Sequence, residues 1–164
     1  MSQIEVAALA GAAGIISMGS LLHLVGMVTP NWKDVGAGTI GLWEICFSGE
    51  CETIEDKADW LIACDFLSVM GVLTSVAAIV LIAFIFFNAL KGRPQHSKIH
   101  IFLIASTTIA ATFIIICIII FASKTAHTLK IRQSFYLSTA GGVLIKIGGI
   151  IGFIISRRLS CGPK

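Results

Sequence analysis

Residues 29–60 read TPNWKDVGAGTIGLWEICFSGECETIEDKADW and form the only long polar stretch in a chain of 164 residues. The stretch contains all three tryptophans, two of the five cysteines and seven of the nine acidic residues. On either side of it, the sequence is dominated by long runs of apolar residues. We therefore expect the rest of the chain to hold this segment at one face of a membrane.

The overall composition favours a membrane protein, because 56% of the residues are hydrophobic and only 13% are charged. In soluble domains the charged fraction is usually about a quarter. The apolar runs are joined by connections too short to contain a second core, so residues 1–164 are expected to form a single domain. The lysines and arginines behind the formal charge of +3 are scattered without interleaved aromatic residues, which gives no reason to expect nucleic acid as a partner.

Four apolar runs are long enough to cross a membrane, which takes roughly 20 residues for about 30 Å of hydrocarbon. They cover residues 6–28, 60–90, 99–121 and 135–155. The third run contains the β-branched sequence IIICIII (114–120), but lipid favours a helix there because a helix satisfies its own backbone hydrogen bonds. Residues 29–59 and 122–134 then form two loops on the same side of the membrane.

The cysteines orient the chain better than its basic residues do. With both termini in the cytoplasm, six lysines and arginines lie on the cytoplasmic side and five outside, a difference too small to decide. Residues 39–47 are strand-like and Ser48-Gly49 can turn the chain, so we expect a small hairpin pinned by a disulfide between Cys46 and Cys51. A disulfide requires the oxidising side of the membrane. We therefore expect a multi-pass plasma-membrane protein with both termini in the cytoplasm.

A spaced pattern within the polar stretch consists of Trp32, Gly41, Leu42, Trp43, Cys46 and Cys51. This pattern resembles the signature of the claudin, peripheral myelin protein and epithelial membrane protein superfamily. Residues 29–32, residues 134–136 and the pair Gly148-Gly149 also resemble claudin segments. The resemblance implies an all-α membrane protein, a left-handed four-helix transmembrane bundle with a small extracellular β-sheet. It further implies that Trp43 ties this sheet to the bundle, and anchoring of the indole at the membrane interface is the alternative.

The function that the resemblance implies is organisation of cell–cell contacts or junctions through the extracellular loops. The alternative is an auxiliary subunit that modulates the gating or trafficking of an ion channel or receptor. The short first loop and the C-terminal sequence SCGPK (160–164), which is not a PDZ-binding tail, both favour the alternative. The expected partners are membrane lipid and other membrane proteins, either copies of this chain or a channel or receptor complex.

The charged residues of the two loops leave two interpretations open. The acidic residues of the first loop either favour cations along a pore or form an ordinary solvated surface. Lys124, Lys130 and Arg132 of the second loop can meet those acids in the same molecule or in a neighbouring one. Association through the loops is therefore a hypothesis that charge reversal can test.

Lys146 lies near the middle of the fourth apolar run, where an unpaired charge costs roughly 2.5 to 3.5 kcal/mol on insertion scales. At 1.5 Å per residue, Asp65 lies about 8 Å and Lys146 about 15 Å below the outer surface. A lysine stem can span such a gap by reaching outward. We therefore predict an intramembrane charge pair between Asp65 and Lys146, with separate contacts of each group to the membrane surface as the alternative.

Small residues and one cysteine complete the candidate sites. Gly141, Gly148 and Gly152 have the spacing that permits close approach of two helices, either within the molecule or against a partner. Cys161 follows two arginines in a position where reversible acylation occurs, and a free thiol is the alternative.

No motif favours an enzyme. The four residues between Cys46 and Cys51 do not provide a Cys-x-x-Cys redox pair. The sequence contains no HExxH or GxSxG motif and no cluster of histidines and carboxylates with metal-ligand spacing. We expect a protein without enzymatic activity and without a cofactor or a bound metal.

Overall fold

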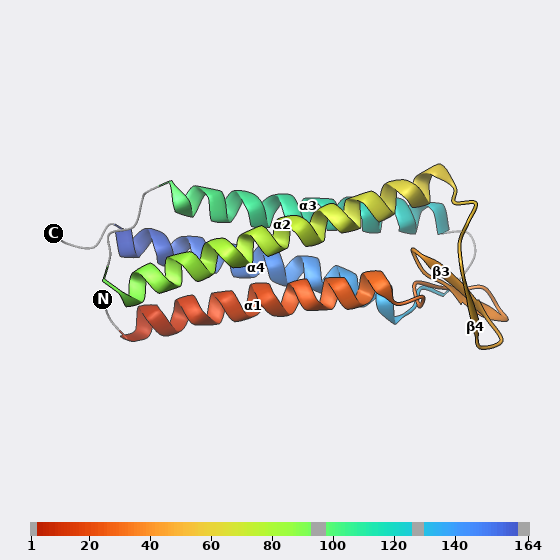
Figure 1. The fold of residues 1–164 in the computed structure, drawn as a ribbon, viewed down its shortest axis with the longest axis horizontal. Helices are drawn as coiled ribbons and strands as arrows, with labels where there is room; N and C mark the ends of the chain where they lie inside the picture. The colour runs from red at the N-terminus through yellow and green to blue at the C-terminus, as the bar shows by residue number, and fades with distance from the viewer. Residues whose placement is uncertain (1–2, 93–97, 126–129, 161–164) are drawn as a thin grey trace.

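The computed structural model describes residues 3–92, 98–125 and 130–160. Its main elements are four long helices that run beside one another, with a small sheet at one end (Figure 1). The helices are α1 (Gln3–Val28), α2 (Asp59–Leu90), α3 (Ile99–Thr125) and α4 (Gln133–Ser160). By length and composition, all four are apolar enough to cross a membrane. Helix α1 begins and helix α4 ends far from the sheet, as Figure 1 shows.

The helices extend further than the apolar runs that predicted them. Helix α3 continues to Thr125, and α4 begins at Gln133 and reaches Ser160. Polar residues at these ends are compatible with a helix, since the Thr125 hydroxyl donates to the carbonyl of Phe121 at 2.6 Å. The apolar runs therefore predicted the last residues of α1 and α2, but left the last turns of α3 and α4 and the first residues of α4 unpredicted.

Glycines set the close packing of α4 against α1, the helix pair with the most extensive contact. A Cβ added to Gly141 would lie 2.5 Å from the carbonyl oxygen of Gly19, and one added to Gly148 would lie 2.7 Å from Ile16 Cγ1. Gly152 is less tightly packed, because its Cβ would lie 3.1 Å from Ile82 on α2. The three glycines thus lie at contacts within the molecule.

Two large apolar clusters and a small third one, formed by Ala110, Ile114 and Ile145, lie in the described part of the bundle. One lies toward the start of α1 and includes Leu9, Ile16, Ile82 and Leu103. The other lies beneath the sheet and is built around Trp32 and Phe121. Only 28 to 39% of the most apolar window of each helix is buried, so much of the apolar surface faces outward.

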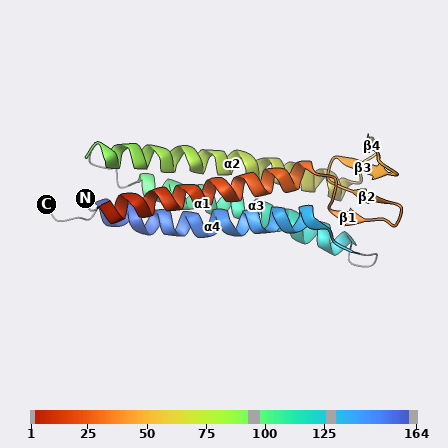
Figure 2. The ribbon, with the colours of Figure 1, turned by 90° about the horizontal axis from the view of Figure 1, so that it is seen from below.

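The sheet contains four short antiparallel strands in the order β1-β2-β3-β4 (Figure 2). They are β1 (Lys33–Asp34), β2 (Gly38–Ile40), β3 (Glu44–Phe47) and β4 (Glu50–Thr53). The predicted hairpin corresponds to β3 and β4. Its two turn residues, Ser48 and Gly49, both have positive φ, as a tight hairpin turn requires.

The strand-like sequence 39–47 is divided into two strands instead of forming one. The chain turns between β2 and β3, where the amide of Gly41 donates to the carbonyl of Glu44 at 2.8 Å. A Cβ on Gly41 would lie only 2.6 Å from Pro30 Cα, so this turn presses directly against the chain leaving α1.

Candidate functional site

We use the term cap for residues 30–58, which carry the four strands at one end of the bundle. Trp32 anchors the cap, because its side chain is completely buried. The indole Nε1 donates to the carbonyl of Gly26 at 2.6 Å. Its ring lies 4.9 Å from that of Phe121 and 5.9 Å from that of Phe135, measured between centroids. A buried indole needs such a polar partner for its N–H, and here one side chain connects the cap to three helices.

Trp43, which the resemblance implies ties the sheet to the bundle, packs against the apolar cluster beneath the sheet. Its side chain is only partly buried, and the ammonium of Lys57 lies 4.4 Å from the centre of its ring. Its neighbour Leu42 is completely buried in the same cluster as Trp32. Trp32 and Leu42 are therefore the fully buried contacts between the cap and the bundle, and Trp43 adds a partly buried one.

The predicted disulfide joins Cys46 and Cys51, which face each other in the register of β3 and β4. All four residues of β4 are exposed, so the disulfide supplements the few backbone hydrogen bonds that hold this edge strand. Glu44 lies close to the two sulfurs, but oxidised cysteines have no thiolate with which to bind a metal. In this form the two cysteines hold β3 and β4 together.

The segment before α4 adds to the opposite edge of the sheet. The amide of Asp34 donates to the carbonyl of Lys130 at 3.1 Å, and the amide of Arg132 donates to the carbonyl of Trp32 at 3.0 Å. Ile131 forms a bridge with Lys33 of β1. The two loops are therefore joined by backbone hydrogen bonds into one surface.

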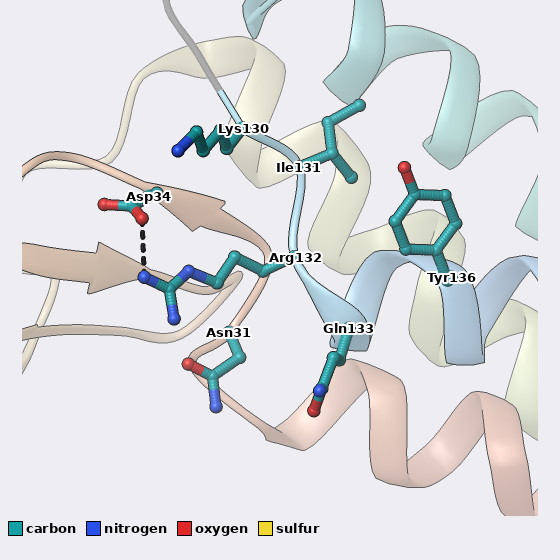
Figure 3. A pocket seen from close by; sticks show the side chains of 7 residues that line it. All are labelled: Asn31, Asp34, Lys130, Ile131, Arg132, Gln133 and Tyr136. Carbon is teal, nitrogen blue, oxygen red and sulfur yellow. Dashed lines mark hydrogen bonds and ion pairs between the residues drawn. The ribbon is translucent and has the colours of Figure 1, made fainter.

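An ion pair reinforces this junction. Arg132 Nη2 lies 2.5 Å from Asp34 Oδ2, as Figure 3 shows. The hydrogen bond from the guanidinium holds the pKa of Asp34 below its ordinary value, and the amide of Gly36 acts in the same direction. A shallow hollow of about 440 Å³ lies beside the pair. It is lined by Asn31, Asp34, Lys130, Ile131, Arg132, Gln133 and Tyr136.

The two edges of the cap carry opposite charge. Strand β4 carries exposed Glu50 and Glu52, and the exposed acidic residues that follow it in the chain are Glu55, Asp56 and Asp59. On the β1 side lie Lys130 and Arg132, both exposed, and the carboxylate of Asp34 is already bound by Arg132. This separation of charge was not visible in the sequence, because it depends on the strand order and on the attachment of residues 130–132 to β1.

The predicted pair between Asp65 and Lys146 is wrong, because each residue has another partner. Asp65 forms an ion pair with Lys57, and the ammonium of Lys146 donates to the Thr108 hydroxyl at 2.6 Å. Counted from the first residues of α2 and α4 at 1.5 Å per residue, Asp65 lies about 9 Å and Lys146 about 20 Å along its helix. The start of α4 at Gln133 widens the gap beyond the reach of a lysine stem.

Within the described residues, His23 contacts only neutral groups of the bundle. It is completely buried, its Nδ1 lies 2.7 Å from the Ser138 hydroxyl, and its Nε2 lies 3.2 Å from the carbonyl of Ser68. The carbonyl can only accept, so Nε2 carries the proton and Nδ1 accepts from the serine. The remaining candidate, Cys161, lies outside the described residues.

Sequence reasoning missed Lys57 and Thr108 as partners of the buried charges. Lys57 had a detectable signal, since it lies just before a helix whose first turns contain a buried aspartate. The ion pair between Arg132 and Asp34 is one of the contacts within the molecule that the charges of the two loops had suggested, whereas the backbone pairing of residues 130–132 with β1 had no signal in the sequence. No model of a known protein family matches the chain, and no curated protein matches it.

Proposed function

We propose that the chain is a four-span membrane protein whose cap lies outside the cell. Four helices of suitable length and composition support this placement. Large apolar side chains cover much of their outer surface, and contiguous apolar surfaces of this kind are rare on soluble monomers. The disulfide in the cap suits the oxidising side, and this supports a placement with the start of α1 and the end of α4 in the cytoplasm.

We further propose that the bundle is of the claudin, peripheral myelin protein and epithelial membrane protein type. The support is local: the signature residues Trp32, Gly41 and Leu42 lie together where the cap contacts the bundle. This clustering explains the spaced pattern physically. Gly41 permits the close contact between the cap and the bundle, and Trp32 and Leu42 fill it.

The function that we propose is organisation of cell–cell contacts or junctions through the cap. The observation that supports it is the opposite charge on the two edges of a cap that is fixed to the bundle. The acidic β4 edge of one copy complements the basic edge at Lys130 of the next. A heterologous contact of this kind repeats and forms rows of molecules. Such a contact is steered by charge and weakened by salt.

A charge-swap experiment tests this function. One variant carries Glu50→Lys and Glu52→Lys, and a second carries Lys130→Glu, which leaves the Asp34–Arg132 pair intact. Cross-linking between differently tagged chains in cells should fall for each variant alone and recover when the two variants are mixed. Lys91→Glu, at the other end of the bundle, serves as the control. Undiminished self-association of both variants, or the absence of recovery in the mixture, would contradict the proposal.

A second function, that of an auxiliary subunit for a channel or receptor, is favoured by a different observation. The ammonium of Lys146 lies midway along α4, where the only acceptor within the described residues is a neutral hydroxyl. A charge in this position suits association with another membrane protein within the bilayer.

A further inference from the structure

Lys146 is held in the middle of the bundle by a single neutral contact. It lies 13 residues after Gln133 and 14 before Ser160. Thr108 donates its own hydroxyl proton to the carbonyl of Ile104 at 2.6 Å, so its oxygen is free to accept from the ammonium. An ammonium has three donors. Within the described part of the chain, Lys146 has no carboxylate partner.

The chain itself has no carboxylate to offer at this depth. Its nine acidic residues are Glu5, Asp34, Glu44, Glu50, Glu52, Glu55, Asp56, Asp59 and Asp65. Helices α3 and α4 contain none of them, Glu5 lies at the start of α1, and Asp65 is paired with Lys57 near the start of α2. A second copy of the chain would bring the same residues at the same depths. The missing counter-charge therefore has to come from a different molecule.

The surface around Lys146 is open to such a molecule. On α4, Val143 and Ile150 lie one turn to either side of Lys146 and are 48% and 42% exposed. On α3, Thr112 and Ile115 follow Thr108 on the same side and are also exposed. We call these residues, with Thr108 and Lys146, the α3–α4 face. The lysine is thus only partly buried, and the side chains beside it on both helices are exposed.

Lipid headgroups are a poor source of the counter-charge. The hydrocarbon core of a bilayer is about 30 Å thick, so its centre lies roughly 15 Å from either headgroup layer. The four-carbon stem of lysine is much shorter than this distance. The contact with Thr108 moreover holds the ammonium at the level of the α3–α4 face and not toward either end of the helix.

We propose that the α3–α4 face is a docking site for a transmembrane helix of another protein, one that carries an aspartate or glutamate at mid-membrane depth. Its carboxylate accepts hydrogen bonds from the ammonium of Lys146, while the Thr108 hydroxyl keeps the ammonium in place. Apolar side chains such as Val143 and Ile150 pack against the same helix. This inference rests on the auxiliary-subunit function, for which it specifies the chemistry of the partner, and it is independent of adhesion through the cap.

The test uses the full-length protein in phosphatidylcholine vesicles and three labelled single-span peptides of leucine and alanine. The peptides differ only at the central residue, which is aspartate, asparagine or leucine. Energy transfer between protein and peptide should show that the aspartate peptide binds at least about tenfold more tightly than the leucine peptide, which corresponds to about 1.4 kcal/mol. The asparagine peptide should behave more like the leucine peptide.

Variants of the protein separate charge from packing. Lys146→Met should abolish the preference for the aspartate peptide, and Lys146→Arg should retain it. Arg158→Met, which removes an exposed charge near the end of α4, should leave it unchanged. Equal binding of the three peptides, or a preference that survives Lys146→Met, would overturn the proposal. Lys146-dependent association between copies of the chain, or loss of the preference when anionic lipid is added, would assign the face to another occupant and overturn it as well.

Membrane placement is checked in the same vesicles by extraction with alkaline carbonate. A protein that is extracted contradicts both the membrane placement and the docking site. A protein that resists extraction but shows no preference among the peptides contradicts the docking site alone.

Discussion

Arg132 Nη2 lies 2.5 Å from Asp34 Oδ2, and this ion pair joins the segment before α4 to the first strand of the cap. The same two residues also take part in backbone hydrogen bonds, Asp34 to Lys130 and Arg132 to Trp32. The cap is therefore attached directly to the start of α4 as well as to the end of α1. A hollow of about 250 Å³ lies between the cap and the helices at the start of α2 and the end of α3.

The ion pair predicts a pH dependence of this junction. The pKa of Asp34 is lowered from 3.8 in the folded protein, so its stabilising contribution is fully present above this pH and is lost as the pH falls through the lower value. Hydrogen exchange, corrected for the intrinsic rate, should show that the amides of Asp34 and Arg132 lose protection below a pH of about 4. In the Asp34→Asn variant this pH dependence should be absent.

The amide of Trp32, which donates to the carbonyl of Ile40, is the internal control and should keep its protection over the same range. A Trp32 amide that lost protection together with the other two would indicate unfolding of the whole cap, and would contradict a local effect of Asp34.

Alanine substitutions should show that Trp32 contributes more to the free energy of unfolding than Trp43 does. Trp32→Ala removes a completely buried side chain and should reduce the free energy of unfolding by about 3 to 5 kcal/mol. Trp43→Ala removes a partly buried ring and its contact with a lysine, and should cost about 1 kcal/mol. Steric trapping of the protein in bicelles measures both values. A larger loss for Trp43 than for Trp32 would make Trp43, and not Trp32, the main contact between the cap and the bundle.

The close contact between α1 and α4 predicts that a single methyl group added between these helices destabilises the protein. Gly141→Ala forces a Cβ against the backbone of Gly19 and should destabilise the protein by about 1 to 3 kcal/mol. Gly11→Ala is the matched control, because a Cβ there meets nothing within 4 Å and alanine favours a helix. The midpoint of thermal unfolding in detergent should fall for the first variant and stay level or rise for the second. Equal behaviour of the two variants would show that the helices separate without cost.

The pair between Lys57 and Asp65 predicts a non-additive double mutant. The two side chains are only 15% and 11% exposed, so Lys57→Met leaves a largely buried carboxylate without its partner and should cost about 3 kcal/mol. Adding Asp65→Leu should recover most of that loss. Lys91→Met, which removes an exposed lysine, controls for the change in net charge. Additive effects of the two substitutions in unfolding measurements would rule out a direct interaction.

The four helices could be predicted from the sequence because each contains an apolar run of the length that a membrane requires. The hairpin and its disulfide could also be predicted, because Ser48 and Gly49 are suitable turn residues between strand-like segments. The remaining strands are too short for a periodic pattern. They form because Gly41 lets the chain turn against Pro30 and because residues 130–132 pair with β1.

The partners of buried groups were harder to predict. Spacing along the chain did not reveal that Trp32 is the completely buried tryptophan, since both Trp32 and Trp43 lie near the expected membrane surface. The Asp65–Lys146 prediction failed because depths counted from apolar boundaries omitted the polar first turn of α4. It also disregarded Lys57, which lies outside the apolar run.

Strand β4 ends the sheet, so its outer backbone groups have no strand beside them within the described residues. Such an edge can recruit an extended segment from any passing chain and start an aggregate. Glu50 and Glu52 oppose the addition of a strand, because an added strand would lie beside two negative charges. Replacing both residues with alanine would therefore remove the charges that oppose strand pairing at this edge. Caps would then be expected to pair with one another through their β4 edges.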